Sequence, residues 1–107
     1  MPNSNSPDNL LKQLFQLVEE RKNSELKNSY TAALFKKGKH RIAQKVGEEA
    51  VEVVIAAIKG NKQELIDEAS DLVFHLFVLL SDAGVTLDDI IIELQKRRMK
   101  RDNDRDN

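Results

Sequence analysis

The chain has 107 residues, of which 40% are hydrophobic and 33% are charged, and its formal net charge is −1. This composition indicates one small globular domain rather than a disordered chain, and the charge gives no overall attraction to nucleic acid or to an anionic membrane. The chain contains no cysteine, which excludes disulfides and thiolate metal sites.

Neither a signal peptide nor a membrane span is recognisable, so we expect a cytoplasmic protein whose partner is a small molecule. Residues 1–7 and 100–107 are polar and lack apolar periodicity, and we expect both to be disordered. Between them, residues 8–99 show apolar residues at helical spacing and no alternation with period two. We therefore predict one all-α domain, an antiparallel bundle of four to five helices. A domain this small buries only about 60 to 70% of its unfolded surface, which favours a homodimer.

The first predicted helix begins near Asp8, which can cap it, and ends near Arg21. A second, short helix follows a cap at Ser29 or Asn28 and extends to about Lys37. The apolar spacing of the first helix predicts an inward face formed by Leu10, Leu11, Leu14, Leu17 and Val18.

Gly38 separates the second helix from a third, which we expect from about Arg41 to Lys59. Gly60 ends this helix because glycine favours the left-handed conformation of a helix end. The residues predicted to face the core are Ile42, Val46, Ala50, Val53 and Ala57.

Asn61 and Glu64 have the spacing of a capping box and open a fourth helix, which extends to about Leu80 or Ser81. Thr86 can cap a fifth helix that extends to about Met99. Short connections between helices favour antiparallel neighbours. The fifth helix is predicted to face the core through Leu87, Ile90, Ile91 and Leu94.

Two acidic clusters lie on consecutive predicted helices, Glu48-Glu49-x-x-Glu52 on the third and Glu68-x-x-Asp71 on the fourth. Residues three or four apart are neighbours on a helix, so each cluster brings like charges together, at a cost of roughly 0.2–0.5 kcal/mol per pair. Hard divalent cations offset such repulsion, and Mg²⁺ in particular is held by a few carboxylates while it binds substrate phosphates. The tight turn between the helices would let the clusters face each other, and we predict a metal site there.

The alternative is that these acids form solvated helix faces, in which Lys45 and Glu49 make an ordinary surface pair. Any single acid fits that interpretation, whereas the joint pattern favours the site. Asp71 precedes an apolar segment, so we expect it to be partly desolvated and to need a counter-charge. A di-iron site would need Glu-x-x-His on two helices, and neither His40 nor His75 completes that motif. A lone helical histidine is more often structural, so His75 is not assigned to the metal.

Positive charge is concentrated immediately before the first acidic cluster, in a stretch that suits phosphate binding. Arg41 and Lys45 share the acidic stripe and are the stronger candidates for binding phosphate. For Lys36, Lys37 and Lys39, a solvated connector is as good an explanation as phosphate binding. The basic residues of this stretch are Lys36, Lys37, Lys39, His40, Arg41 and Lys45.

These motifs resemble those of phosphoribosyl-ATP pyrophosphohydrolases, which catalyse the second step of histidine biosynthesis. The resemblance spans about Leu10 to Arg97. On a broader level, the acidic pattern is similar to that of the MazG-like nucleotide pyrophosphohydrolases, which are all-α, Mg²⁺-dependent dimers or higher assemblies. The matching segments are Ser29-Tyr30-Thr31-Ala32-x-Leu34, Lys45-Val46-Gly47-Glu48-Glu49-Ala50-x-Glu52 and Glu68-Ala69-x-Asp71-Leu72-x-x-His75.

The resemblance implies Mg²⁺-dependent hydrolysis of phosphoribosyl-ATP to phosphoribosyl-AMP and pyrophosphate, by attack of a metal-activated water between the α and β phosphorus atoms. It implies that the Mg²⁺ ligands are Glu49, Glu52, Glu68 and Asp71. Glu48 would be a further ligand or would orient the attacking water, so the catalytic candidates are Glu48, Glu49 and Glu52. The substrate-binding candidates are Lys45, Arg41, Ser29, Tyr30, Thr31 and Lys37, although Ser29 to Thr31 also fit a helix cap followed by a core aromatic.

Two other functions stay open. One is a house-cleaning pyrophosphohydrolase that acts on canonical or damaged nucleoside triphosphates, and the other is a non-catalytic helical dimerisation module. In many organisms the phosphoribosyl-ATP activity is fused to a phosphoribosyl-AMP cyclohydrolase domain. The sequence contains no such domain, so we expect a monofunctional chain.

Overall fold

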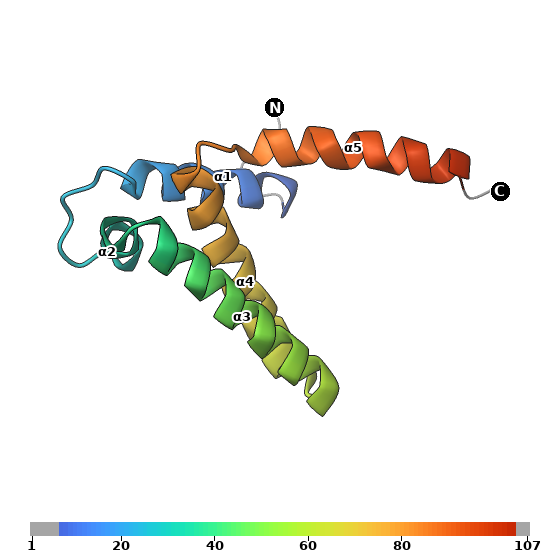
Figure 1. The fold of residues 1–107 in the computed structure, drawn as a ribbon, viewed down its shortest axis with the longest axis horizontal. Helices are drawn as coiled ribbons and strands as arrows, with labels where there is room; N and C mark the ends of the chain where they lie inside the picture. The colour runs from blue at the N-terminus through green and yellow to red at the C-terminus, as the bar shows by residue number, and fades with distance from the viewer. Residues whose placement is uncertain (1–6, 105–107) are drawn as a thin grey trace.

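The computed structural model describes residues 7–104, which form helices joined by short connections and contain no strand (Figure 1). The all-α prediction is confirmed. The parts of the predicted disordered ends at 1–6 and 105–107 lie outside the described residues. The helices are α1 (Pro7–Arg21), α2 (Tyr30–Lys37), α3 (Lys39–Lys59), α4 (Lys62–Asp82) and α5 (Leu87–Asp104).

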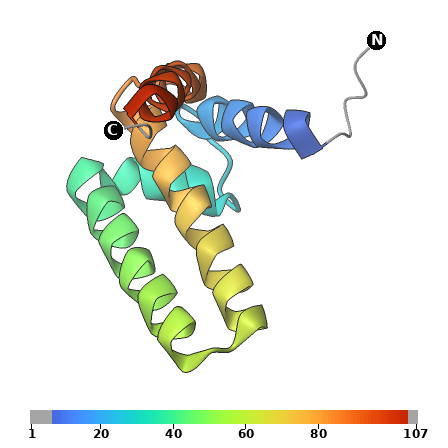
Figure 2. The ribbon, with the colours of Figure 1, turned by 90° about the vertical axis from the view of Figure 1, so that its right-hand side faces the viewer.

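Helices α3 and α4, each of 21 residues, form an antiparallel hairpin (Figure 2). The turn is tight because Gly60 adopts the left-handed conformation, with φ of 76°, and its backbone N–H donates to the carbonyl of Ala57. The side chain of Asn61 accepts from the backbone N–H of Glu64 at 3.0 Å and caps α4. Gly60 therefore ends α3 and Asn61 caps α4 as predicted. The capping box is only half formed, because the Glu64 carboxylate lies 3.0 Å from Lys59 Nζ. The turn places the two acid-bearing helices side by side.

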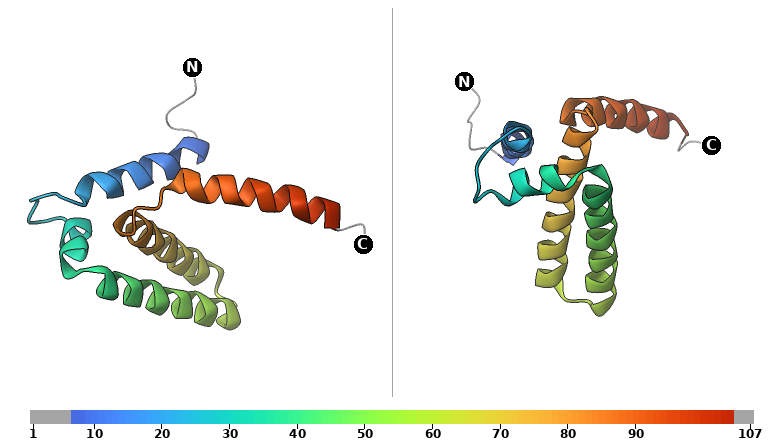
Figure 3. Two further views of the ribbon diagram at one scale, coloured as in Figure 1. Left: turned by 45° about the horizontal axis from the view of Figure 1, so that its top comes forward. Right: turned by 60° about the vertical axis from the view of Figure 1, so that its left-hand side comes forward.

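The hydrophobic core lies at the open end of this hairpin, where α1 and α2 cross it (Figure 3). The rings of Phe15 on α1 and Phe77 on α4 pack edge to face with centroids 5.4 Å apart. Gly38, with φ of 94° and ψ of 170°, lets the chain turn sharply from α2 into α3. The buried core residues are Phe15, Val18, Leu34, Phe35, Ile42, Phe77 and Val78.

Several apolar residues predicted to be buried are exposed instead. On α1 the prediction was wrong for Leu10, Leu11 and Leu17, because α1 crosses the hairpin end and only a narrow stripe around Phe15 contacts it. On α3, Ala56 is buried and Ala57 is exposed. The difference follows from helical phase, since Ala56 lies about 40° from the line of buried Ile42, whereas Ala57 lies about 60° from that line on its other side. The other predicted residues of α3 are buried or half-buried.

Helix α5 leaves α4 at an angle of 108° and extends away from the rest of the molecule (Figures 1 and 3). Its start is a reciprocal capping box, in which Thr86 and Asp89 each accept from the other's backbone N–H. The helix continues to Asp104, past the predicted end near Met99, because its last turns consist mainly of good helix formers and a Glu93–Arg97 pair supports them.

Leu94 was predicted to face the core, and this was wrong, because α5 projects beyond the hairpin and leaves that side chain exposed. Within residues 7–104, no single helix has the length and apolar character needed to cross a bilayer. Helices α4 and α5 together would be long and apolar enough, but the chain is bent by 108° between them.

Candidate metal centre

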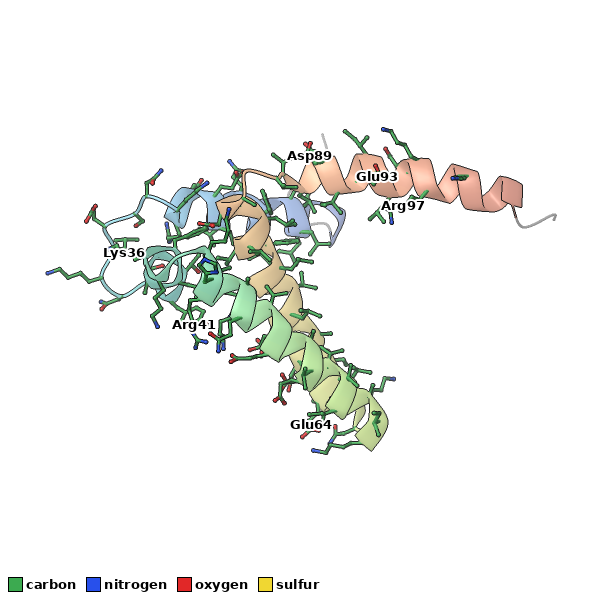
Figure 4. All side chains as sticks on the ribbon, in the orientation of Figure 1. Lys36, Arg41, Glu64, Asp89, Glu93 and Arg97 are labelled. Atoms are coloured by element: carbon green, nitrogen blue, oxygen red, sulfur yellow. The ribbon has the colours of Figure 1, made fainter. Side chains whose placement is uncertain are left out.

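Three carboxylates meet between the two helices of the hairpin. Glu49 of α3 and Glu68 and Asp71 of α4 each offer an oxygen, and these three oxygens lie within 4.8 Å of one another. We call this group the acidic trio. Figure 4 shows that Arg41, near one end of the hairpin, and Glu64, near the other, project from the same side, and the positions of the trio residues along the two helices fall between them. Carboxylate oxygens at this separation are typical of a hard divalent cation site.

The other two acids of the predicted site have different surroundings. Glu52 contributes no oxygen to the trio, but its charge acts on Glu68. Glu48 is turned toward the cationic end of α3, where its carboxylate lies 3.7 Å from Arg41 and 4.0 Å from Lys45. The predicted site is thus divided into a trio, one acid beside it, and one acid held by cations.

The trio is partly shielded from water, but through its two glutamates and not through Asp71 as expected. Asp71 is exposed, so the prediction that it is desolvated was wrong, whereas Glu49 and Glu68 are half-buried. The apolar neighbour Leu72 is half-buried, so the apolar segment that follows Asp71 does not carry the Asp71 carboxylate inward with it. Desolvation raises the pKa of the Glu68 carboxyl, and the neighbouring negative charges raise it further, in the order Glu52, Asp71, Glu49 and Asp67.

The raised pKa of Glu68 has a consequence for the metal-free protein. The folded state holds the Glu68 proton more tightly than the unfolded chain, so stability should decrease as pH rises from 4.5 through the raised pKa. We expect Glu68→Gln to remove this decrease and to melt above the wild type near pH 7 in the presence of a chelator. Thermal melts between about pH 4 and pH 8 measure the effect. Glu20→Gln, at an exposed position of α1, is the control and should melt as the wild type does at each pH. Identical melting profiles for all three proteins would contradict the expectation.

Cations flank the trio on α3. The Lys45 side chain is only 22% exposed, and its Nζ lies 3.4 Å from a carboxylate oxygen of Glu49. Lys45 therefore provides the counter-charge of Glu49 in the metal-free protein. Arg41 lies one turn earlier, and together these residues form a positive border beside the trio. The lysines at 36, 37 and 39 are exposed, and Figure 4 shows Lys36 projecting outward from α2.

The Ser-Tyr-Thr segment forms the start of α2. The Ser29 hydroxyl accepts from the backbone N–H of Ala32 at 3.1 Å, so it acts as the helix cap. Thr31 is half-buried in the first turn. Tyr30 is exposed rather than a core residue, and its hydroxyl lies 2.9 Å from Nε2 of His75. This segment therefore reaches the acid-bearing face of α4 through one tyrosine.

His75 connects Tyr30 to the trio. Its Nδ1 lies 2.7 Å from the backbone carbonyl oxygen of Asp71, and the side chain is only 6% exposed. The sequence analysis interpreted His75 as a structural residue, and its burial agrees with that interpretation. The hydrogen bond between His75 and Tyr30 was not predicted. The available signal was the position of His75 one turn after Asp71, on the same side of α4.

Comparison with known proteins places this geometry in a family context. Residues 11–98 match the sequence model of the family described as phosphoribosyl-ATP pyrophosphohydrolase. The chain is 52% identical over 93 residues to the histidine biosynthesis bifunctional protein HisIE of Buchnera aphidicola subsp. Schizaphis graminum, covering 87% of this chain and 45% of the relative. It is 54% identical over 87 residues to HisIE of Vibrio cholerae, covering 81% and 41%. The chain spans less than half the length of these relatives.

Proposed function

The chain belongs to the phosphoribosyl-ATP pyrophosphohydrolase family, and we propose that it hydrolyses phosphoribosyl-ATP to phosphoribosyl-AMP and pyrophosphate. The observation that carries the proposal is the acidic trio, which lies within the matched residues 11–98. A triphosphate brings several negative charges to a surface that is itself acidic, so the reaction needs a bridging cation. The trio fits this need because it offers three oxygens and no competing soft ligand.

The cation in this proposal is Mg²⁺, held by Glu49, Glu68 and Asp71 with Glu52 as a further ligand. Oxygen donors at 4.8 Å or less from one another suit a hard ion. Bound there, Mg²⁺ supplies positive charge to the phosphates and lowers the pKa of a coordinated water. Glu52 lies three residues after Glu49 on the same helix face, so a change of its side-chain rotamer brings a fourth carboxylate toward the ion.

The remaining residues have roles around that centre. Glu48 is held by Arg41 and Lys45 at the border of the trio, and in this proposal it orients the attacking water. Lys45 loses Glu49 as its partner when a cation binds, which leaves its ammonium group available for a substrate phosphate. Arg41 and the more exposed Lys37 extend this positive border.

The deciding experiment is turnover of phosphoribosyl-ATP by the purified chain, measured as pyrophosphate release with Mg²⁺ and with excess chelator. We expect release only with Mg²⁺. Release from ordinary nucleoside triphosphates but not from phosphoribosyl-ATP would support a house-cleaning enzyme instead. No release from any nucleotide, under conditions in which a related enzyme is active, would refute the proposal and favour a non-catalytic module.

We also propose that the chain acts as a cytoplasmic homodimer. On each helix of the hairpin, large exposed apolar side chains lie roughly opposite the trio residues of that helix by helical phase. Exposed apolar residues gathered on a small domain are typical of an interface, and two helix hairpins that pair through such residues form a four-helix bundle. These exposed apolar residues are Val51, Val54, Ile55 and Ile58 on α3 and Ile66, Val73 and Leu76 on α4.

Charge placed among these apolar residues should separate the copies. We expect Val54→Glu to halve the molar mass in light scattering, because the buried carboxylate would have no partner in the dimer. Leu26→Glu is the control, since Leu26 is equally exposed but lies in the connection between α1 and α2. A wild type that is already monomeric, or an unchanged mass for Val54→Glu, would contradict this interface.

A further inference from the structure

Tyr30 is the one aromatic side chain that the fold leaves open to solvent. The chain has four phenylalanines, one tyrosine and no tryptophan, and all five aromatic residues lie within the described range 7–104. Phe15, Phe35 and Phe77 are buried and Phe74 is half-buried, whereas Tyr30 is 54% exposed. A nucleobase is bound most readily by an open aromatic face, because stacking depends on the π-surface and not on a particular hydrogen-bond pattern.

The hydrogen bonds of His75 fix the place of that ring. The carbonyl of Asp71 can only accept, so Nδ1 of His75 carries the proton that it donates there. In the neutral ring Nε2 is then an acceptor, and the Tyr30 hydroxyl donates to it at 2.9 Å. The order Tyr30 to His75 to Asp71 thus connects an exposed ring on α2 to the backbone of a trio residue on α4.

Ring contacts restrain Tyr30 further. Its ring packs edge to face against His75 with centroids 5.8 Å apart, and it lies tilted against Phe74 at 6.1 Å. His75 itself packs edge to face against Phe74 at 5.1 Å. A ring held by one hydrogen bond and two aromatic neighbours loses little further freedom when a ligand stacks on it.

We propose that Tyr30 is the stacking platform for the adenine base of the nucleotide, and that His75 is a positioning residue that holds this platform beside the acidic trio. This inference rests on the proposed function, because it assumes that the trio engages the phosphates of the same nucleotide. The imidazole acts through Tyr30 and does not touch the substrate. The base and the phosphates are then bound on one side of the hairpin by different elements, α2 for the base and the two long helices for the phosphates.

Two amide substitutions separate the two hydrogen bonds of His75. In His75→Gln the amide oxygen reaches the position of Nε2 and can accept from Tyr30, whereas in His75→Asn the amide nitrogen reaches the position of Nδ1 and leaves Tyr30 without its acceptor. We expect KM for phosphoribosyl-ATP to rise about tenfold in His75→Asn and in Tyr30→Phe, with little change in kcat. The KM of His75→Gln for phosphoribosyl-ATP should stay near that of the wild type. Equal effects of both amides, or a loss of kcat without a change in KM, would refute the positioning role.

The stacking itself can be observed without turnover. Tyrosine-labelled protein gives a single ring spin system in NMR spectra, because Tyr30 is the only tyrosine. With Mg²⁺ present, α,β-methylene-ATP should move the Tyr30 ring protons upfield through the ring current of adenine, whereas tripolyphosphate, which has no base, should not. The shift should persist in His75→Gln and shrink in His75→Asn.

The same shift from both probes, or from neither, would overturn the stacking platform. Pyrophosphate release from phosphoribosyl-ATP is measured separately. An upfield shift without release refutes the proposed reaction and leaves the stacking in place, whereas release without the shift refutes the stacking alone.

Discussion

Glu49→Gln and Asp71→Asn should each lower kcat/KM for phosphoribosyl-ATP by at least about a hundredfold. Loss of a group that merely orients a metal ligand costs about 10- to 100-fold in affinity or activity, and these substitutions remove a ligand itself. The shapes of both side chains are kept, so the change is confined to charge and to metal-binding capacity. The two residues come from opposite helices of the hairpin, and equal losses would indicate one ion shared between them.

Metal affinity should decrease together with activity, and calorimetric titration with Mg²⁺ measures it. The folded state should persist, because each substitution relieves like-charge repulsion around Glu68. Asp67→Asn is the matched control, since it removes a carboxylate adjacent to Glu68 that binds Gln63 and lies outside the trio. Wild-type Mg²⁺ affinity in both trio variants would contradict the assignment of the metal centre.

Ile42→Ala should destabilise the protein by about 2–5 kcal/mol, which is a large fraction of the roughly 5–15 kcal/mol typical of a small domain. Ile42 has no exposed surface and lies in the first turn of α3, in the core shared by the first four helices. A cavity there would loosen the corner from which Arg41 and Lys45 project, so we expect a weaker positive border as well.

Urea unfolding measures the loss, at one protein concentration because a dimer couples stability to concentration. Ile92→Ala on α5 makes the same chemical change at a side chain that is 51% exposed, and it should alter the free energy of unfolding by less than about 0.5 kcal/mol. An equal decrease in the free energy of unfolding in the two variants would mean that Ile42 does not lie in the core.

The starts of α2, α4 and α5 and the end of α3 could be predicted because their signals are local. Ser29, Asn61 and Thr86 each cap the helix that follows, and Gly60 adopts the backbone conformation that ends α3. Each of these features depends on residues within one turn. The pairing of α3 with α4 follows from the tight turn, so the meeting of Glu49 with Glu68 and Asp71 could be expected from spacing alone.

The remaining features depend on contacts that periodicity does not contain. The leucines of α1 recur at helical spacing, but this spacing does not reveal how much of the surface of α1 is buried by the other helices of the same chain. The orientation of Glu48 toward Arg41 depends on a side-chain rotamer and on nearby cations. The bond between Tyr30 and His75 joins residues that are 45 positions apart, and only the crossing of α2 over the hairpin brings them together.

The location of the core at one end of the hairpin also divides the molecule by local stability. Amide protons near Ile42 should exchange with solvent only on global unfolding, whereas those near Gly60 are far from the core and should exchange through small openings of the last turns. The trio lies between these regions, so an ion that joins α3 to α4 would stabilise mainly the weaker half. Ligand occupancy would thereby extend the rigid part of the protein from the crossing helices toward the turn.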